Sequence, residues 1–101
     1  MLFLSKIKKF IEKPNLELAK KLIKENTIGL VATVTPDGYP AVSPKATTIV
    51  LDSTHLAFID LRSPKTKRNI KANPFVELNY IDVFRRQACR IKGKGHLYRK
   101  W

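Results

Sequence analysis

The fold is decided by residues 28–38, which read Ile28-Gly29-Leu30-Val31-Ala32-Thr33-Val34-Thr35-Pro36-Asp37-Gly38. Most residues of 28–35 are small or β-branched, and the run is too short for a stable helix, so it predicts a buried β-strand. Pro36 suits the first corner of a tight turn, and Gly38 is free to adopt a positive φ. Because a second β-rich run covers residues 41–50, we expect the two segments to form a hairpin.

Further β-rich segments follow the hairpin. Residues 56–61, 75–81 and 88–98 predict a third, a fourth and a fifth strand. Basic and uncharged residues alternate along the last of them, as in a strand with one face toward solvent. One face carries a basic row, Arg90, Lys92, Lys94 and His96, and the other carries Cys89, Ile91, Gly93, Gly95 and Leu97. Five short strands separated by turn signals predict a small antiparallel barrel.

The residues before the hairpin predict two helices. Residues 4–11 place apolar side chains at helical spacing with lysines on the other side, which indicates a short amphipathic helix. Pro14 interrupts it, and Asn15 is placed to cap a second helix that ends at Glu25-Asn26. We interpret the lysines of these helices as a solvated face rather than as a membrane-binding or nucleic-acid-binding surface.

One more helix is expected between the strands. Ser63 is a suitable cap, Pro64 suits the first helical position, and Asn73-Pro74 is a typical stop signal. The predicted fold class is therefore mainly β (α+β), with N-terminal helices and one helix between strands.

The start of that internal helix is a candidate anion site. A helix N-terminus offers unpaired backbone N–H groups and a partial positive charge. Here Arg62, Lys65 and Lys67 add cations, and Ser63 and Thr66 add hydroxyls. Together these groups can satisfy a phosphate dianion by charge-assisted hydrogen bonds. From the residues alone, a phosphate site and an ordinary capped helix with a solvated basic first turn stay equally open.

Length and composition indicate a single domain over residues 1–101. With 44% hydrophobic residues in 101, two separate cores would each be too small to be stable. No apolar run is long enough to span a membrane, and Met1-Leu2-Phe3-Leu4 is too short for the apolar part of a signal peptide. We therefore expect a soluble, cytoplasmic protein without a membrane partner.

The formal charge of +12 comes from 20 Lys and Arg residues against 8 Asp and Glu residues. Such a surface attracts nucleic acid, anionic membranes or phosphorylated small molecules, and charge alone does not choose among them.

Side chains typical of catalysis are sparse. The single cysteine, Cys89, lies on the apolar face of its strand and is interpreted as a core residue, and His55 and His96 as surface residues. The chain has no zinc-site spacing, no paired carboxylates and no Ser/His/Asp arrangement. If the protein is an enzyme, we expect a cofactor to supply the chemistry.

Three stretches resemble the FMN-binding split-barrel family related to pyridoxamine 5′-phosphate oxidase. They are residues 28–40 with 42–45, residues 58–70 closing in Ala72-Asn73-Pro74, and residues 89–95. The resemblance implies a split barrel that binds FMN in a cleft between two protomers, so that a homodimer completes the cofactor site.

The resemblance also implies roles for particular residues. Lys65 and Thr66, preceded by Arg62 and Ser63, stand where relatives hold the FMN phosphate. The strand with Ser43, Pro44 and Lys45 resembles the segment that lines the isoalloxazine ring, and Lys92 and Gly93 match the strand that flanks the cofactor. Lys45 near the pyrimidine edge of the ring would raise the flavin's reduction potential.

This chain departs from the oxidase in two respects. Ser43 and Thr48 stand where the oxidase has an Arg and, five residues later, a Lys, and the oxidase's C-terminal Arg-rich motif is missing. Relatives usually continue for another strand and helix after the strand that holds Gly93 and Gly95, so we expect this sequence to be either a short form or part of a longer protein. We therefore expect an FMN-dependent oxidoreductase or electron-transfer protein other than pyridoxamine phosphate oxidase itself, with substrate and redox partner unassigned.

Two alternatives to this function stay open at the level of sequence. One is a nucleic-acid-binding module that uses the basic row of residues 90–96. The other is a split barrel of the same kind that binds haem or a deazaflavin in place of FMN.

Overall fold

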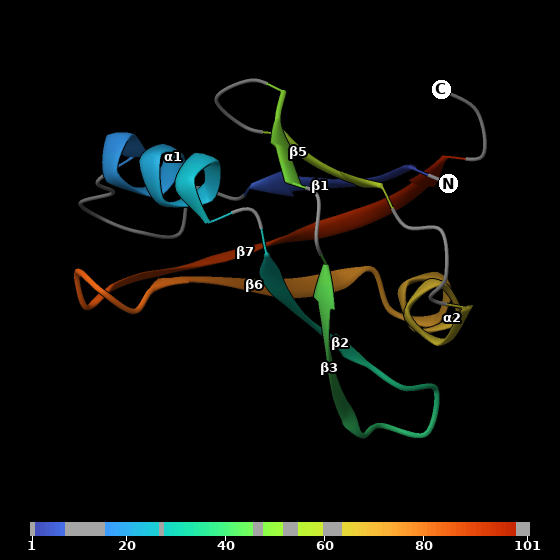
Figure 1. Ribbon diagram of the computed structural model, residues 1–101. Helices are drawn as coiled ribbons and strands as arrows, with labels where there is room; N and C mark the ends of the chain where they lie inside the picture. Colours follow the sequence, from blue (N-terminus) through green and yellow to red (C-terminus); the bar gives the residue numbers. More distant parts are fainter. Residues whose placement is uncertain are drawn as a thin grey trace.

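The computed structural model describes residues 2–7, 16–26, 28–45, 48–51, 55–59 and 64–98 (Figure 1). Its elements are β1 (Leu2–Ile7), α1 (Leu16–Glu25), β2 (Gly29–Val34), β3 (Pro40–Lys45), β4 (Thr48–Val50), β5 (His55–Ile59), α2 (Pro64–Ala72), β6 (Phe75–Asp82) and β7 (Gln87–Tyr98). One antiparallel sheet and two helices make up the described part of the chain, in agreement with the mainly β, α+β split-barrel class expected from sequence.

The strand order explains why the barrel is split. The strands follow the order β3-β2-β6-β7-β1-β5-β4, so β3 and β4 form the two edges of the sheet although they are consecutive in the chain. Three Cα–Cα steps join Lys45 to Thr48, which limits their separation to about 11 Å. The sheet must therefore curl until its edges approach, yet in the described residues β3 pairs only with β2 and β4 only with β5. We call this gap between β3 and β4 the seam.

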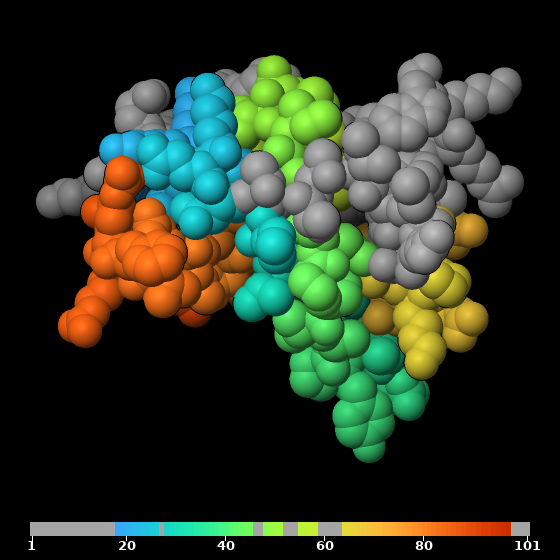
Figure 2. Space-filling view, in the orientation of Figure 1, coloured from blue at the N-terminus to red at the C-terminus, as the bar shows by residue number. Residues whose placement is uncertain are grey.

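The β2–β3 hairpin has the turn that the sequence predicts. The Gly38 amide donates to the Thr35 carbonyl over 2.9 Å, and the Thr35 amide donates to the Tyr39 carbonyl over 2.8 Å. Gly38 adopts a φ of 92°, a conformation that favours glycine. The hairpin projects below the body of the molecule (Figure 2).

The first predicted helix is wrong for residues 4–7. They belong to β1, which pairs with β5 along one edge and with β7 along the other. Hydrogen bonds to β5 and to β7 satisfy the backbone N–H and C=O groups of this segment on both sides. Because these partner strands lie far away in the chain, the local sequence gives no sign that the segment is a strand. The remaining residues of that predicted helix, 8–11, lie outside the described residues.

The second β-rich run, residues 41–50, is two strands and not one. The chain leaves β3 at Lys45 and enters β4 at Thr48 on the opposite edge of the sheet. The described sheet thus has seven strands where the sequence predicted five. The predicted helix caps Asn15 and Ser63, and Leu61 at the end of the third predicted strand, lie outside the described residues.

The core lies inside the curled sheet, between the helices. Leu22 and Ile23 of α1 and Ile70 of α2 pack against apolar side chains from the inner faces of the strands. The strand residues of this cluster are Val31, Leu56, Phe58, Val76, Leu78, Tyr80 and Ile91. The two helices lie at opposite ends of the sheet, and the contacts of α2 are mainly with β2 and β7.

Tyr80 connects two distant strands across this interior. Its side chain is completely buried, and its hydroxyl shares a 2.8 Å hydrogen bond with the hydroxyl of Thr48. Tyr80 lies on β6 and Thr48 on β4, with three strands between them in the sheet. A Cβ at Gly29 would approach the Tyr80 ring to 2.7 Å, so the ring requires a glycine at that position of β2.

Candidate functional site

The structure brings the end of β3 against the first turn of α2. The hydroxyls of Ser43 and Thr66 lie 3.2 Å apart, and the Lys45 ammonium donates to Thr66 Oγ1 over 3.5 Å. Ser43 and Lys45 are two residues apart on a strand, so both side chains point to the same face of the sheet. Thr66 is the third residue of α2, which begins at Pro64 as the sequence predicts. We call Ser43, Lys45 and Thr66 the β3–α2 cluster.

The cluster is buried and well supported. Lys45 is 4% exposed and Thr66 is 7% exposed. One helical turn after Thr66, the Asn69 side chain donates to Thr33 Oγ1 over 3.0 Å, and Asn69 is itself buried. This bond fixes α2 against β2 beside the cluster, so the hydroxyls and the ammonium are held in place by the fold.

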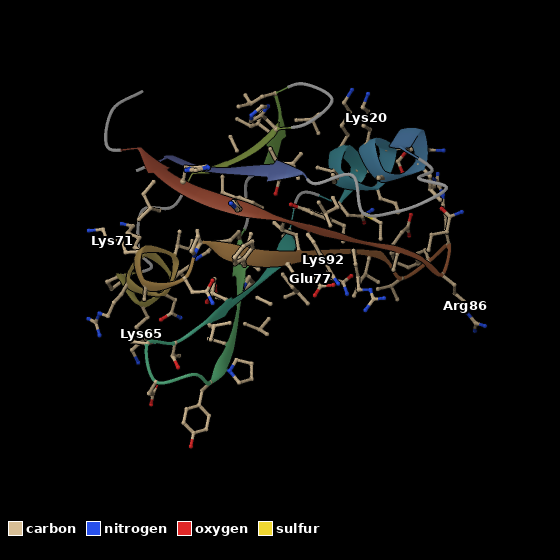
Figure 3. All side chains as sticks on the ribbon, turned by 180° about the vertical axis from the view of Figure 1, so that it is seen from behind. Lys20, Lys65, Lys71, Glu77, Arg86 and Lys92 are labelled. Carbon is tan, nitrogen blue, oxygen red and sulfur yellow. The ribbon has the colours of Figure 1, made fainter. Side chains whose placement is uncertain are left out.

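The electrostatic character of the cluster favours an anion. The first turn of α2 contains no acidic residue, and Lys65 and Lys67 add positive charge to it. Lys65 is exposed and extends from α2 toward solvent, and Lys67 is half-buried (Figure 3). Helix amides, two hydroxyls and a buried ammonium together form a donor set that suits a phosphate group.

The other residues predicted for the cofactor site are distributed differently. Pro44 lies on the opposite, exposed face of β3. Gly93 is buried on the inner face of β7, whereas Lys92 is exposed on the outer face, in register with Glu77 of β6 (Figure 3). The strands β2 and β6 separate β7 from β3, so the cluster does not include Lys92. Arg62 and Ser63 lie outside the described residues.

Sequence reasoning missed Asn69 and Thr33, which hold the cluster in place. A signal for Asn69 was present, because Thr66, Asn69 and Ile70 stand at helical spacing and all three are buried. No local pattern identifies Thr33 as the partner, since it lies 36 residues away in the chain.

The outer face of the sheet carries exposed apolar side chains beside buried polar atoms. Its exposed apolar residues are Ile28, Leu30, Val42, Phe75 and Ile81, with Val42 64% exposed. Among them, Glu77 Oε1 and Asn79 Oδ1 are buried without a hydrogen-bond partner. Arg90 Nε lies 3.9 Å from Glu77 Oε1, which is an ion pair but not a hydrogen bond. Buried acceptors of this kind call for donors, so this face has the character of an interface.

Cys89 and the histidines do not form a catalytic arrangement. Cys89 is half-buried against the core, and burial raises the pKa of its thiol above the ordinary value. A thiol of raised pKa is a poor nucleophile, which agrees with the structural interpretation of this residue. His96 is exposed as expected, but His55, also expected at the surface, is half-buried as the first residue of β5. No group of three or more metal-ligating side chains occurs among the described residues.

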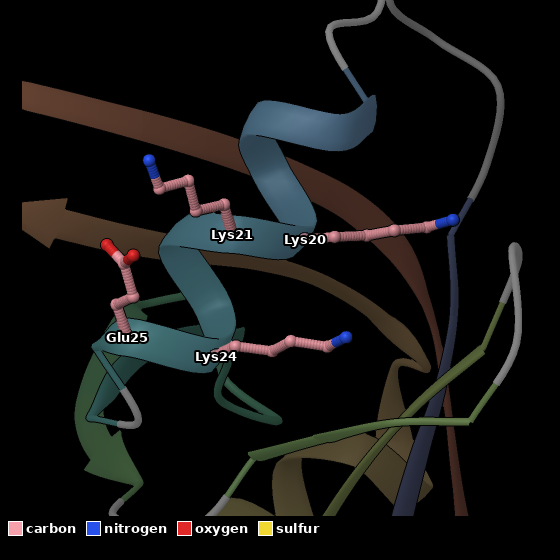
Figure 4. Close-up of a pocket in the computed structure, with 4 residues that line it drawn as sticks. All are labelled: Lys20, Lys21, Lys24 and Glu25. Carbon is pink, nitrogen blue, oxygen red and sulfur yellow. The ribbon is translucent and has the colours of Figure 1, made fainter.

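The hollow on α1 is a solvated surface. It is lined by Lys20, Lys21, Lys24 and Glu25, whose side chains extend outward along the helix (Figure 4). Glu25 pairs with Arg85 of the β6–β7 turn over 2.9 Å. None of the residues predicted for a cofactor lies in this hollow. Neither of the described helices is long and apolar enough to cross a membrane.

Comparisons with known proteins agree with this architecture. A family model described as pyridoxamine 5′-phosphate oxidase matches residues 15–100. The crystal structure of HupZ from Group A Streptococcus is 27% identical with a TM-score of 0.72, over 77% of this chain and 62% of HupZ. A candidate pyridoxamine 5′-phosphate oxidase from Lactobacillus delbrueckii is 34% identical with a TM-score of 0.72, over 85% of this chain and 69% of its own.

The chain thus spans less than two thirds of the length of HupZ. A substituted form of HupZ gives a TM-score of 0.68 at 27% identity, over 73% of this chain and 62% of that one. No curated protein matches this chain.

Proposed function

This chain belongs to the pyridoxamine 5′-phosphate oxidase family, whose split-barrel fold is of the flavin-binding oxidoreductase type, and we propose that it binds FMN and acts in oxidation–reduction through it. The observation that carries this proposal is the β3–α2 cluster. Two hydroxyls and a buried ammonium meet there at the first turn of α2. This donor set fits the phosphate of FMN.

In this proposal the protein supplies binding and orientation, and FMN, when bound, supplies hydride or electron transfer. Thr66, with the amides at the start of α2, holds the phosphate, and Lys65 adds charge from the exposed side of the helix. Ser43 adds its hydroxyl to that of Thr66 at the phosphate, and Gly93 allows close approach of the cofactor on β7. Pro44, which the family resemblance also implies, lies on the opposite face of β3. Lys92, Arg62 and Ser63 complete the set implied by the family.

The proposed assembly is a cytoplasmic homodimer. The exposed apolar side chains on the outer face of the sheet, such as Leu30 and Val42, support this assembly because association removes them from water. The buried acceptors Glu77 Oε1 and Asn79 Oδ1 support it further, since a second copy can supply donors.

Pyridoxamine phosphate oxidase activity itself is not part of the proposal. Thr48, which stands where the oxidase has a Lys, points into the core and bonds to Tyr80. Its side chain is 8% exposed and is not available to a substrate. A different substrate or a protein redox partner is expected.

The absorption spectrum of the purified protein, before and after FMN is added, tests the proposed function. We expect flavin bands and a stoichiometric complex. A haem Soret band, a deazaflavin spectrum or a protein that stays colourless with added FMN would refute FMN as the cofactor.

A Thr66→Val substitution tests the location of the site. It removes the hydroxyl at nearly constant volume, so FMN affinity should fall about tenfold, the effect of one hydrogen bond to a charged group. Thr35→Val, in the remote β2–β3 turn, is the control and should leave the affinity unchanged. Equal affinities in all three proteins would put the phosphate elsewhere.

Nucleic-acid binding is the second candidate function, favoured by one observation. The basic row of β7, Arg90, Lys92, Lys94 and His96, is exposed along one face. Within it, Arg90 pairs with Glu77 of β6, and the Lys94 ammonium lies 5.3 Å from the centre of the Phe75 ring. Fluorescence anisotropy with a labelled oligonucleotide distinguishes this candidate, because affinity should fall steeply with salt.

A further inference from the structure

We propose that the turn between β6 and β7 binds the surface of an anionic membrane, with Val83 and Phe84 entering the lipid and basic side chains beside them contacting the headgroups. The inference goes beyond the proposed function and does not depend on the cofactor. A turn that rests on a membrane needs no spanning segment, so what changes is the expectation of a protein without a membrane partner.

Two adjacent apolar side chains are displayed at the tip of the β6–β7 hairpin. Val83 is 76% exposed and Phe84 is 99% exposed, the highest values among the large apolar residues that the structure describes. Turn positions usually hold Gly, Pro, Asn, Asp or Ser, each of which favours the turn itself. Single exposed apolar residues are common, but a neighbouring pair at a hairpin tip forms an apolar projection whose burial is favourable.

The fold holds this turn in one shape. Asp82 is buried, and its Oδ1 accepts hydrogen bonds from the amides of Phe84 and Arg85, each over 3.1 Å. The Arg85 guanidinium donates to Glu25 Oε2 of α1 over 2.9 Å. Arg86 then adopts a φ of 54°, in the left-handed region, as the chain enters β7. Because the backbone of the turn is already ordered, binding through its tip costs little conformational entropy.

Basic side chains lie beside the apolar pair. Arg86 extends away from the body of the molecule (Figure 3). The ion pair of Arg85 with Glu25 places the turn against α1, where Lys21 extends on the same side of the helix as Glu25 (Figure 4). Arg85 also pairs with Asp82, so these three groups leave one negative charge, which Arg86 and the lysines of α1 outweigh. The charge at this end of the molecule therefore complements an anionic surface.

The shape of this end favours lipid over a macromolecule with a fixed surface. The β6–β7 hairpin (orange) stands out beside α1 in Figure 2. A protein partner would need a pocket shaped to receive Phe84, whereas a lipid surface admits a protruding side chain without one. A nucleic-acid base can stack on the Phe84 ring but gives no matching partner to Val83. An apolar tip with cations behind it suits both layers of a membrane interface, the acyl chains and the phosphates.

Co-sedimentation of the protein with lipid vesicles tests the inference. The vesicles contain phosphatidylcholine alone or phosphatidylcholine with about one third phosphatidylglycerol, and we expect binding to the anionic ones. Val83→Ser combined with Phe84→Ser should weaken that binding about tenfold or more, because the apolar contribution is lost. Tyr39→Ser, at a residue 68% exposed on the β2–β3 hairpin, is the matched control and should leave binding unchanged.

A second set of variants tests the contribution of charge. Arg86→Gln should weaken binding to the anionic vesicles about fivefold, the effect of one cation near an anionic membrane, and added salt should weaken it further. Arg68→Gln, at an exposed position on α2 at the opposite end of the molecule (Figure 1), is the control and should have no effect. All of these positions are exposed, so the variants should melt at the temperature of the wild type.

A tryptophan at the tip locates the contact. In a chain with Trp101→Phe, which removes the single native tryptophan, Phe84→Trp should show shorter-wavelength emission with anionic vesicles and quenching by brominated lipid. Phe84→Leu should bind the vesicles as the wild type does, because lipid requires an apolar side chain and not an aromatic ring.

Several outcomes would overturn the inference. The wild type would then ignore anionic vesicles or bind uncharged ones equally well, or the double serine variant would bind as the wild type does, which would reduce the contact to charge alone. An oligonucleotide that binds the wild type but not Phe84→Leu, without any binding to vesicles, would assign the turn to nucleic acid instead. FMN affinity should be the same in all these variants, so failure here leaves the proposed function untouched.

Discussion

Tyr80 shows how a single residue connects strands that lie far apart in the sheet. Its ring fills the space above Gly29 on β2, and its hydroxyl reaches Thr48 on β4. Gly29 lies on β2, next to the edge strand β3, and Thr48 lies on β4 at the other edge of the sheet. One buried side chain thus links β4 to the strand beside β3, and the β3–α2 cluster lies near the same edge.

Removal of the Tyr80 hydroxyl should destabilise the protein. Tyr80→Phe leaves the Thr48 hydroxyl buried without this partner, so we expect the free energy of unfolding to fall by about 1–2 kcal/mol, measured by urea denaturation. Tyr39→Phe is a matched control, since Tyr39 is 68% exposed in the hairpin turn region, and it should have no effect. Equal stabilities for Tyr80→Phe and the wild type would mean that the hydrogen bond contributes nothing net.

The same residue predicts how stability depends on pH. Burial raises the pKa of the Tyr80 phenol above its ordinary value of 10.0. The unfolded chain therefore releases this proton at a lower pH than the folded protein, and the stabilising contribution is complete below pH 10 and declines above it. Alkaline unfolding curves of the wild type should show this loss, and those of Tyr80→Phe should show less of it.

At the level of elements, local signals were sufficient for some segments and not for others. The β2–β3 turn, the start of α2 at Pro64 and the alternation along β7 were predicted because each depends on residues close together in the chain. β1 was not predicted, because the strands that pair with it, β5 and β7, lie far away in the chain. The residues of β4 were predicted to be extended, but as a continuation of β3. The junction between β3 and β4, Ala46-Thr47, also lacks the Gly, Asn or Asp that usually marks a turn.

The same division applies to the candidate site. The basic helix start was evident from sequence, because Lys65, Thr66 and Lys67 are neighbours. The approach of Ser43 and Lys45 to Thr66 depends on how β3 packs against α2, over separations of 23 and 21 residues. Residue types indicated a candidate anion site, and the fold showed which strand lies against it.

The docking of α2 gives a prediction at the scale of elements. Asn69→Ala removes the bond to Thr33 Oγ1 and leaves that buried hydroxyl without this donor, which should cost about 1–3 kcal/mol. Because the bond fixes the helix beside the cluster, FMN affinity should fall as well. Arg68→Ala, at an exposed position on the same helix, serves as control for helix propensity. A normal affinity for FMN in Asn69→Ala would show that the cluster does not need this support.

At the scale of the whole molecule, the outer face of the sheet is the feature least typical of the surface of a monomer. It combines exposed apolar residues with two buried acceptors that have no donor. A second copy of the chain would cover the exposed apolar residues and supply donors for the buried acceptors. The excess of positive charge favours an anionic ligand and does not by itself promote association.

Val42→Asp should break the proposed dimer. Val42 is 64% exposed on the outer face of β3, and a carboxylate there would be buried in the interface at a high cost in free energy. Sedimentation equilibrium should give a monomer where the wild type is a dimer, and FMN affinity should fall with it. Leu51→Asp, 51% exposed just after β4, is the control. A wild type that is monomeric at every concentration would refute the dimer itself.

The open seam has one more consequence, which concerns how such a site changes over evolution. β3 is an edge strand, and in the described residues β2 is the strand paired with it, so its second row of backbone N–H and C=O groups faces the seam. A ligand that binds there is recognised in part by the main chain, which every sequence retains. Side chains along the strand can then be replaced, as Ser43 illustrates, while the strand edge keeps its ability to bind. In homologous sites of this kind, the sequence motif should change sooner than the ligand that is bound. The backbone contacts would preserve binding after the side-chain motif has been lost.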